Sequence, residues 1–386
     1  MRAMPWTGGS GASLRPGAAL SCAPQREGWV EEMAKRYKAL VAGASGIVGR
    51  RLAEHLLTMP EWEVVALSRK EPVGGSPVPR IAVDLTDAAD ARAKLGGLSD
   101  ITHVFYIARY DHPEGQPEPV EINVGMFRNL LDTMTVAAPD LQHVHLGSGH
   151  KNYGFHMSKA VTPAKETTPR GIHPSFYFRQ EDYMHEKQRG QKWSWSTARS
   201  STLCDTAPGI TRSVAGLIQT YAAISKELGL PLRFPGTPGN YNALYQVTDA
   251  TLLAKAMAWM STEPRCANQN INITNGDIFR WSELWPLFAD YFGMELGPVQ
   301  TVDLPTVMAD KGPIWDRIVA KHGLIRQPLD AVTLWSYGRH LWSHDWDIVT
   351  DTTKSRLLGF HEYVETGPMF LRLFDHFRRE KVFPSE

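Results

Sequence analysis

The 386-residue sequence has little cysteine, no excess of charge and no long hydrophobic run. Its three cysteines, Cys22, Cys204 and Cys266, are far apart and form no CxxC pair. They predict no disulfide framework and are typical of a reducing compartment, so we expect a cytoplasmic protein. The 41 Lys and Arg residues balance the 41 Asp and Glu residues, whereas a nucleic-acid binder would carry a basic stripe. No apolar run approaches the ~20 residues of a membrane-spanning helix. We therefore expect neither a nucleic-acid partner nor a membrane.

The first part of the chain, residues 1–36, differs in composition from the rest. No acidic residue precedes Glu27, and Gly, Ala and Pro dominate. We expect a disordered leader, or sequence upstream of a true start at Met33. A transit peptide is the alternative, because such peptides are rich in arginine and poor in acids, but the segment lacks their amphipathic pattern.

Short apolar stretches alternate with helical patterns from Tyr37 to about residue 205. The expected strands are residues 38–43, 63–67, 80–83, 102–107, 142–146 and 194–203. This alternation predicts βαβ units and an α/β fold, namely a Rossmann-type doubly wound parallel sheet. Beyond residue 206 the alternation ends, and helical segments and tryptophans become frequent. We therefore expect a Rossmann domain over residues 37–205 and a smaller, mainly helical substrate-binding lobe over residues 206–386, partly interleaved with it.

A glycine-rich turn, Gly43-Ala-Ser-Gly46-Ile-Val-Gly49, follows the first expected strand and opens a helical pattern. In a dinucleotide-binding turn the first glycine permits the tight turn and the second lets the backbone approach the pyrophosphate. The third permits close packing of the helix on the strand, and the helix N-terminus attracts the phosphate charge. A plain glycine turn is the alternative. We expect the following residues to contact the cofactor: Gly43, Ser45, Gly46, Ile47, Val48 and Gly49.

The end of the second expected strand favours NADP over NAD. An NAD site usually has Asp or Glu there, about 20 residues further on, to hold the ribose 2′-hydroxyl. This chain has Ser68-Arg69-Lys70 instead. One charge-assisted contact to a 2′-phosphate is worth ~1.5–3 kcal/mol, so we expect NADPH/NADP⁺ as the cofactor. Alternatively, Arg69 and Lys70 form a solvated turn. We expect Asp84 and Leu85 to contact the cofactor, with Asp84 at the adenine, although Asp84 could equally cap the helix that follows.

Two arrangements of Tyr and Lys are candidates for catalysis. In ordinary short-chain dehydrogenases a Lys follows a Tyr by four residues on one helix face and lowers the pKa of the phenol from about 10. Tyr183 and Lys187 match this spacing, which also arises by chance. In the second arrangement Lys151 follows the fifth expected strand and Tyr177 opens the next helix. Open α/β sheets place their chemistry at the carboxyl ends of the strands, where Lys151 lies.

The residues of the second arrangement carry a resemblance to a known family. The chain resembles the progesterone 5-beta-reductase / iridoid synthase-like family, an atypical branch of the extended short-chain dehydrogenases. The resemblance covers about residues 37–386. The matching stretches are Gly43 to Gly49, Arg69, Thr102-His-Val-Phe-Tyr-Ile107, Asn123-Val-Gly-Met-Phe-Arg-Asn-Leu-Leu131, His150-Lys151-Asn-Tyr153-Gly, Phe176-Tyr177-x-x-x-Glu181-Asp182, Asn272-Ile-Thr-Asn-Gly-Asp277-x-Phe-x-Trp281 and Asp351-Thr-Thr-Lys-Ser-Arg-Leu-Leu-Gly359-Phe.

This resemblance implies NADPH-dependent 1,4-reduction of the C=C bond of a small apolar enone or enal. The family's lysine corresponds to Lys151 and its tyrosine to Tyr177, and both are expected to contact the cofactor, together with Ser201. Three positions depart from the family. Phe178 replaces a second tyrosine, Ser200 replaces the proline that usually follows the arginine at Arg199, and Ser175 replaces the asparagine of plant members. Tyr177 is therefore the only one of the two adjacent positions with a hydroxyl group.

Aromatic residues near Lys151 are candidates for the wall of a substrate pocket. We expect Tyr153, Phe155 and Phe178 to line it, with ordinary core packing as the alternative. His143 and His145 share one face of a strand, but no third ligand at zinc spacing accompanies them, so we expect no metal.

Two other functions stay open. An ordinary carbonyl reductase or sugar-nucleotide epimerase would use Tyr183 and Lys187, and the reductase would convert an enone to an allylic alcohol rather than a saturated ketone. A nucleotide-sensing regulator would bind NADP without chemistry and need not keep Lys151 and Tyr177 together. The oligomeric state is also open, with a homodimer among the options.

Overall fold

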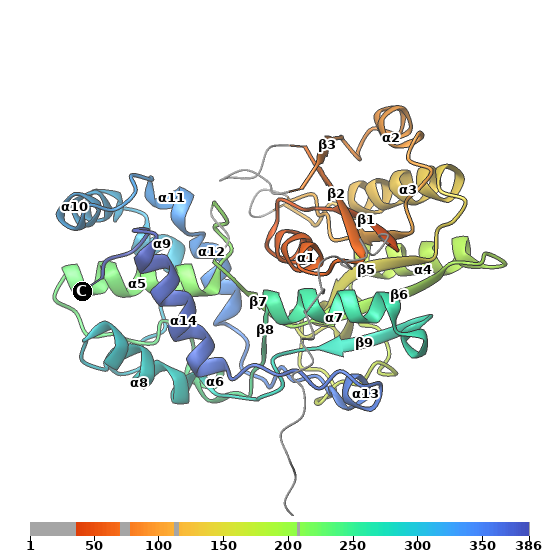
Figure 1. Ribbon diagram of the computed structural model, residues 1–386. Coiled ribbons are helices and arrows are strands. Elements are labelled where there is room, and N and C mark those ends of the chain that lie inside the picture. The colour runs from red at the N-terminus through yellow and green to blue at the C-terminus, as the bar shows by residue number, and fades with distance from the viewer. Residues whose placement is uncertain (1–35, 70–77, 112–115, 207–208, 386) are drawn as a thin grey trace, which may run out of the picture. The chain divides into compact units, whose positions relative to one another are not determined.

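A seven-stranded parallel sheet organises the protein (Figure 1). The computed structural model describes residues 36–69, 78–111, 116–206 and 209–385, so the expected leader and Lys70 lie outside the described residues, apart from Arg36. The strand order, β3-β2-β1-β4-β5-β6-β9, confirms the predicted Rossmann-type doubly wound sheet. Its strands are β1 (Tyr37–Ala42), β2 (Trp62–Ser68), β3 (Arg80–Ala82), β4 (His103–Tyr106), β5 (His143–Gly149), β6 (Ser194–Ser200) and β9 (Gln269–Ile273).

Helices cover both faces of this sheet, because successive side chains of a strand point to opposite sides. On one face, Ala39 and Val41 of β1 pack in a cluster with residues of α1 (Ile47–Leu57) and α7 (Ala250–Thr262). On the other face, Leu40 and Ala42 pack in a cluster with residues of α2 (Ala88–Leu95), α3 (Val120–Ala137) and α4 (Phe176–Gln188). A central parallel strand is buried on both sides, which explains why β1 is a continuous apolar run.

The expected strand over residues 194–203 is two strands in the structure. After β6 the chain leaves the large sheet at Ser201, whose backbone N–H donates to Thr248 Oγ1 at 3.0 Å. The next strand, β7 (Thr202–Cys204), pairs with β8 (Val247–Asp249) in a separate two-stranded sheet. The strand β9, which the sequence did not predict, pairs with β6. Residues after 206 thus contribute the strand β9 to the large sheet and the helix α7 to the layer that covers one of its faces. The division of the chain at residues 205/206 stays a prediction.

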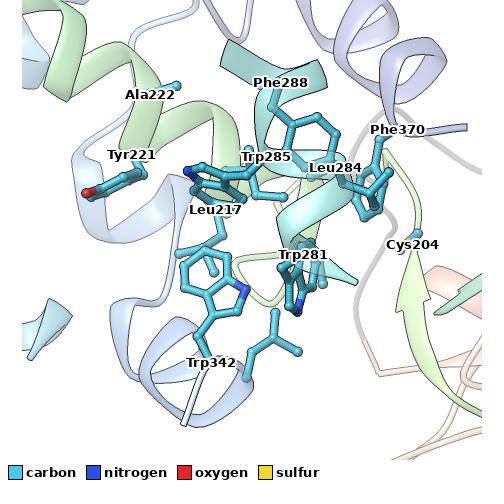
Figure 2. Close-up of a cluster of buried hydrophobic side chains, with 14 of the residues drawn as sticks. Cys204, Leu217, Tyr221, Ala222, Trp281, Leu284, Trp285, Phe288, Trp342 and Phe370 are labelled. Atoms are coloured by element: carbon cyan, nitrogen blue, oxygen red, sulfur yellow. The ribbon is translucent and has the colours of Figure 1, made fainter. Parts of the chain in front are cut away.

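The remaining helices pack around a core rich in tryptophan (Figure 2). Trp281 and Trp285 lie on α8 (Trp281–Phe292), and they contact Trp342 and the helix α14 (Thr366–Arg379) through Phe370. The rings of Trp285 and Trp342 meet edge to face, with centroids 5.6 Å apart, an arrangement that the aromatic quadrupole favours. The other helices here are α5 (Val214–Glu227), α6 (Pro238–Asn242), α9 (Leu304–Met308), α10 (Gly312–His322), α11 (Leu329–Val332) and α12 (Trp335–Leu341). The short helix α13 (Thr353–Leu357) instead packs against β9, and the 3₁₀ turn at Pro264–Cys266 packs against α7.

Within the described parts of the chain, no helix combines the length and the apolar character that crossing a membrane would require.

The tryptophan core generates a stability prediction. Trp281→Ala is expected to lower the free energy of unfolding by ~3–5 kcal/mol, because it removes a fully buried ring and leaves a cavity. Urea unfolding followed by far-UV circular dichroism measures the change. Val136→Ala is the control, since Val136 is 84% exposed on α3, and it should change the free energy by less than ~0.5 kcal/mol. Equal effects of the two substitutions would contradict the central place of Trp281.

Candidate active site

Two glycines of the turn after β1, Gly43 and Gly49, have no room for a side chain. Gly43 has a φ of +90°, and a Cβ there would lie 2.8 Å from the backbone nitrogen of Ala108. A Cβ on Gly49 would lie 2.2 Å from the carbonyl oxygen of Gly43, so this glycine lets α1 pack against the turn. Gly46 precedes the first residue of α1 and provides no side-chain cap. The backbone N–H groups at the start of α1 are thus available to a phosphate group.

A cavity of about 260 Å³ lies between this turn and the ends of β2 and β4. Six predicted cofactor residues line it, namely Gly43, Ser45, Gly46, Ser68, Arg69 and Leu85. The guanidinium group of Arg69 lies over the ring of Tyr110, with 5.7 Å between its carbon and the ring centroid. Arg69 therefore lies in the cavity wall, at the position where the sequence predicts a contact to a 2′-phosphate.

Asp84 is not part of this wall. Its Oδ1 accepts hydrogen bonds from the backbone N–H and the hydroxyl of Thr86, and these bonds lower the pKa of the carboxyl group. The cap of α2 is Asp87, whose side chain accepts from the backbone N–H groups of Ala89 and Asp90. The structure therefore contradicts the alternative in which Asp84 caps that helix.

A second cavity, of about 350 Å³, brings together Lys151 and Tyr177. Lys151 lies in the 3₁₀ turn at His150–Tyr153, directly after β5, and Tyr177 is the second residue of α4. Both side chains lack a hydrogen-bond partner among the described residues. Burial lowers the pKa of Lys151 from its usual 10.5, partly offset by the charge of Glu118. Burial also raises the pKa of the Tyr177 hydroxyl above 10.

The two cavities are adjacent, because Ile107, Ala108 and Arg109 line both of them. Ile47 and Val48 of α1 and Ser201 also line the cavity of Lys151 and Tyr177, as the sequence predicted for residues near the cofactor. The Ser201 hydroxyl donates to the carbonyl oxygen of Gln246 at 2.6 Å. A continuous site thus runs along the carboxyl edge of the sheet, from Arg69 to Tyr177.

A buried ion pair connects the elements that carry Lys151 and Tyr177. Arg199 of β6 and Glu181 of α4 are 4% and 3% exposed, and Arg199 Nη2 lies 3.1 Å from Glu181 Oε1. Arg199 Nη1 also donates to the Tyr153 hydroxyl at 3.3 Å. The pair therefore links the strand end, the turn with Lys151 and the helix with Tyr177. Removing one partner of such a buried pair is strongly destabilising.

The alternative pair, Tyr183 and Lys187, is engaged elsewhere. The Tyr183 hydroxyl donates to Asp132 Oδ1 at 2.5 Å, and Lys187 Nζ lies 2.6 Å from the same oxygen. Asp132 is on α3, so the pair faces that helix. Neither residue lines the cavity that contains Lys151 and Tyr177.

The three aromatic residues expected in the substrate pocket do not line either cavity as described. The Tyr153 hydroxyl is buried and donates to Asn272 Oδ1 at 2.6 Å. Phe155 is fully buried in the core of the helical lobe. Phe178 stacks with His173 and Arg170, with ring centroids 5.2 Å apart in the first of these contacts. Core packing, the alternative that the sequence left open, accounts for Phe155.

Sequence reasoning missed several residues of the cavity wall. Arg109 follows β4 at the carboxyl edge, so the rule that placed Lys151 could have found it. The others come from distant segments of the second half of the chain and carry no motif. They are Arg212, Tyr245, Tyr337, His340 and His344.

The histidines of β5 have structural partners. His143 contacts the hydroxyl groups of Ser194 and Ser196, and His145 contacts the hydroxyl of Ser196. Burial lowers the pKa of His145 to about 3, so this ring is neutral at neutral pH. Among the described residues, no group of three or more His, Cys, Asp or Glu side chains is placed to hold a metal ion.

Comparisons with known proteins agree with this architecture. A solved UDP-glucose 4-epimerase from Thermotoga maritima superposes with a TM-score of 0.62 at 14% identity, covering 89% of this chain and 99% of that one, which shows a shared fold. An (S)-8-oxocitronellyl enol synthase of Nepeta cataria is 34% identical over 371 residues, covering 90% of this chain and 92% of the relative. A 3-oxo-Δ4,5-steroid 5-beta-reductase of Arabidopsis thaliana is 30% identical over 363 residues, covering 90% of this chain and 93% of the relative.

These relatives confirm the resemblance found in the sequence. The family with a PRISE-like Rossmann-fold domain matches residues 82–384, which include Lys151, Tyr177 and every helix after residue 206. The chain belongs to the family of proteins with a PRISE-like Rossmann-fold domain.

Proposed function

We propose that the protein is an NADPH-dependent oxidoreductase that reduces the C=C bond of α,β-unsaturated carbonyl compounds, small enones or enals, by 1,4-addition. The observation that carries the proposal is the cavity shared by Lys151 and Tyr177, which adjoins the phosphate-binding turn. The relatives support it, because one is named for forming an enol and another for reducing a Δ4,5 double bond next to a 3-oxo group.

The residues of the first cavity fit NADPH. The turn at Gly43 and Gly49 admits only backbone, so a pyrophosphate could approach the N–H groups at the start of α1. Arg69, stacked on Tyr110, supplies a cation for the 2′-phosphate. When bound, NADPH supplies the hydride that adds to the β-carbon of the substrate.

Tyr177 stabilises the charge that develops on the substrate. As hydride arrives at the β-carbon, negative charge builds on the carbonyl oxygen, which becomes an enolate. A hydroxyl aimed at that oxygen lowers the barrier, because it is already oriented and need not reorganise. The raised pKa of Tyr177 keeps its proton on the phenol at neutral pH. Water can then protonate the α-carbon, so no further acid is required.

Lys151 acts beside Tyr177 as a positive charge. It orients the phenol and the cofactor ribose, and its field stabilises the enolate oxygen. Burial lowers the pKa of Lys151 and the charges of Arg109 and Arg212 lower it further, whereas the charges of Glu118 and Asp111 favour the protonated form. A carbonyl reductase or epimerase built on Tyr183 and Lys187 is not favoured, because Asp132 holds both side chains away from the cavity.

We further propose that the protein works in the cytoplasm. Its two described cysteines, Cys204 and Cys266, are buried free thiols, which suits a reducing compartment. The homodimer stays a prediction.

Replacing Tyr177 and Tyr183 by phenylalanine, one at a time, tests the proposed function. Tyr177→Phe should lower kcat with 2-cyclohexen-1-one by ~10²–10³, because it removes the donor to the enolate oxygen. Tyr183→Phe should change kcat by less than about threefold, since its hydroxyl is bound to Asp132. NADPH absorbance gives the rates, and product analysis should find the saturated ketone. A loss confined to Tyr183→Phe, with allylic alcohol as product, would transfer catalysis to the alternative pair.

The charge on Lys151 predicts a pH dependence. A lysine is charged below its pKa, and burial lowers that pKa below 10.5, so kcat should fall as the pH rises through the lowered value. Lys151→Arg should move the fall to higher pH, because a guanidinium group stays charged. The measurement is kcat at saturating substrates from neutral to alkaline pH. An alkaline fall that is identical in both proteins would show that Lys151 does not cause it.

A further inference from the structure

The cavity that contains Tyr177 is lined by three cations, Lys151, Arg109 and Arg212, and the two arginines pair with Glu118 and Asp111 at its edge. No Asp or Glu lines it among the described residues. A cleft lined by charges of one sign focuses its field and raises the local concentration of ligands with the opposite sign. The Lys, Arg and His residues of its lining are Arg109, Lys151, Arg212, His150, His156, His340 and His344.

The proposed function accounts for two of the three cations. Arg109 also lines the cavity of the glycine turn, so it lies where the phosphates of the cofactor would pass. Lys151 is assigned to the reaction itself. Arg212 lines only the cavity of Lys151 and Tyr177, together with Tyr337 and His340. Arg212 is therefore the cation of this cavity that is available to bind the substrate.

The ion pair between Arg212 and Asp111 leaves N–H donors of the guanidinium group for a ligand. Arg212 Nη1 lies 3.3 Å from Asp111 Oδ1, and the two side chains are 34% and 63% exposed. Solvent screens such a pair and makes it weak. A guanidinium group has five N–H donors in a planar fork, so one contact at Nη1 leaves donors for a carboxylate. Asp111 lines the cavity of the glycine turn and not the cavity that His340 lines.

Burial is the main cause of the low pKa of His340 in the wall. Together with smaller effects of His344, Lys151 and Arg212, it lowers the pKa of His340 to about 4. The ring is thus neutral at neutral pH and can still donate one N–H. His156 Nδ1 is buried and has no hydrogen-bond partner among the described residues. An anion in the cavity would offset the cations and give the imidazole groups a polar partner.

We propose that the substrate is an acidic enone, an α,β-unsaturated carbonyl compound whose carboxylate is bound by Arg212, with His340 beside it. This inference rests on the proposed function and refines the apolar substrate expected from the sequence. The enone carbonyl would lie at Tyr177 and the carboxylate at the wall formed by α12 and Arg212. The cavity volume of about 350 Å³ restricts the substrate to a small molecule.

A matched pair of substrates tests the proposal. The probes are 3-(3-oxocyclohex-1-enyl)propanoate and the corresponding propanamide, which have nearly the same shape and the same enone. Wild-type kcat/KM should be roughly 10- to 100-fold higher for the carboxylate, the range that a charge-assisted hydrogen bond provides. Arg212→Gln should remove this preference by lowering kcat/KM for the carboxylate, and leave the amide within about twofold. Arg212→Lys should retain part of the preference.

Two controls separate the role of Arg212 from a general loss of structure. Arg339→Gln, on the same wall helix α12 but paired with Asp303 and outside the cavity lining, should leave the preference intact. The Kd of NADPH should be unchanged in Arg212→Gln. Equal turnover of the two probes by the wild type, or an equal loss for both in Arg212→Gln, would overturn the acidic substrate alone. Failure to reduce either probe or 2-cyclohexen-1-one would overturn the proposed function, and this inference with it.

Discussion

Parallel pairing of the strands directs every carboxyl end to one edge of the sheet, and the site depends on this constraint. The glycine turn follows β1, Arg109 follows β4 and Lys151 follows β5, and these strands are neighbours in register. No separate long-range contact has to bring these residues together, because the backbone hydrogen bonds of the sheet already do so. The fully buried residues of β1 hold that edge in place by packing against helices on both faces.

Burial then acts in opposite directions on the two groups proposed for catalysis. It raises the pKa of the Tyr177 hydroxyl and lowers the pKa of the Lys151 ammonium group, since a buried site disfavours the charged form of each. At neutral pH the phenol keeps its proton and can donate it in a hydrogen bond. The charge of Glu118 offsets part of the lowering of the lysine pKa. The Arg199–Glu181 pair fixes the turn and the helix that present these groups.

Local sequence patterns predicted most strands of the large sheet. Continuous apolar runs identified β1, β2, β4 and β5, and the glycine spacing identified the turn at Gly43, because both signals depend on neighbouring residues. The break at Ser201 was missed, since the run of β-branched and aromatic residues continues through it. The break arises because Thr248, far along the chain, binds the Ser201 backbone.

The wall of the cavity was harder to predict. Tyr153 and Phe155 are close to Lys151 in sequence, but a 3₁₀ turn directs their side chains to Asn272 and to the helical core. Arg212 and His340 reach the cavity only through the packing of the helical lobe, which no local pattern encodes. The likeness of Tyr183 and Lys187 to an ordinary catalytic pair was a matter of helical spacing, and Asp132 on a neighbouring helix decides its role.

The position of hydride addition tests the central claim most directly. In this measurement, 2-cyclohexen-1-one is reduced with NADPH that carries deuterium at C4, in the position from which the enzyme takes the hydride. The product is then analysed by NMR. The account predicts saturated ketone with deuterium at the β-carbon. Deuterium on the carbonyl carbon of an allylic alcohol would contradict it, because the protein would then be an ordinary carbonyl reductase.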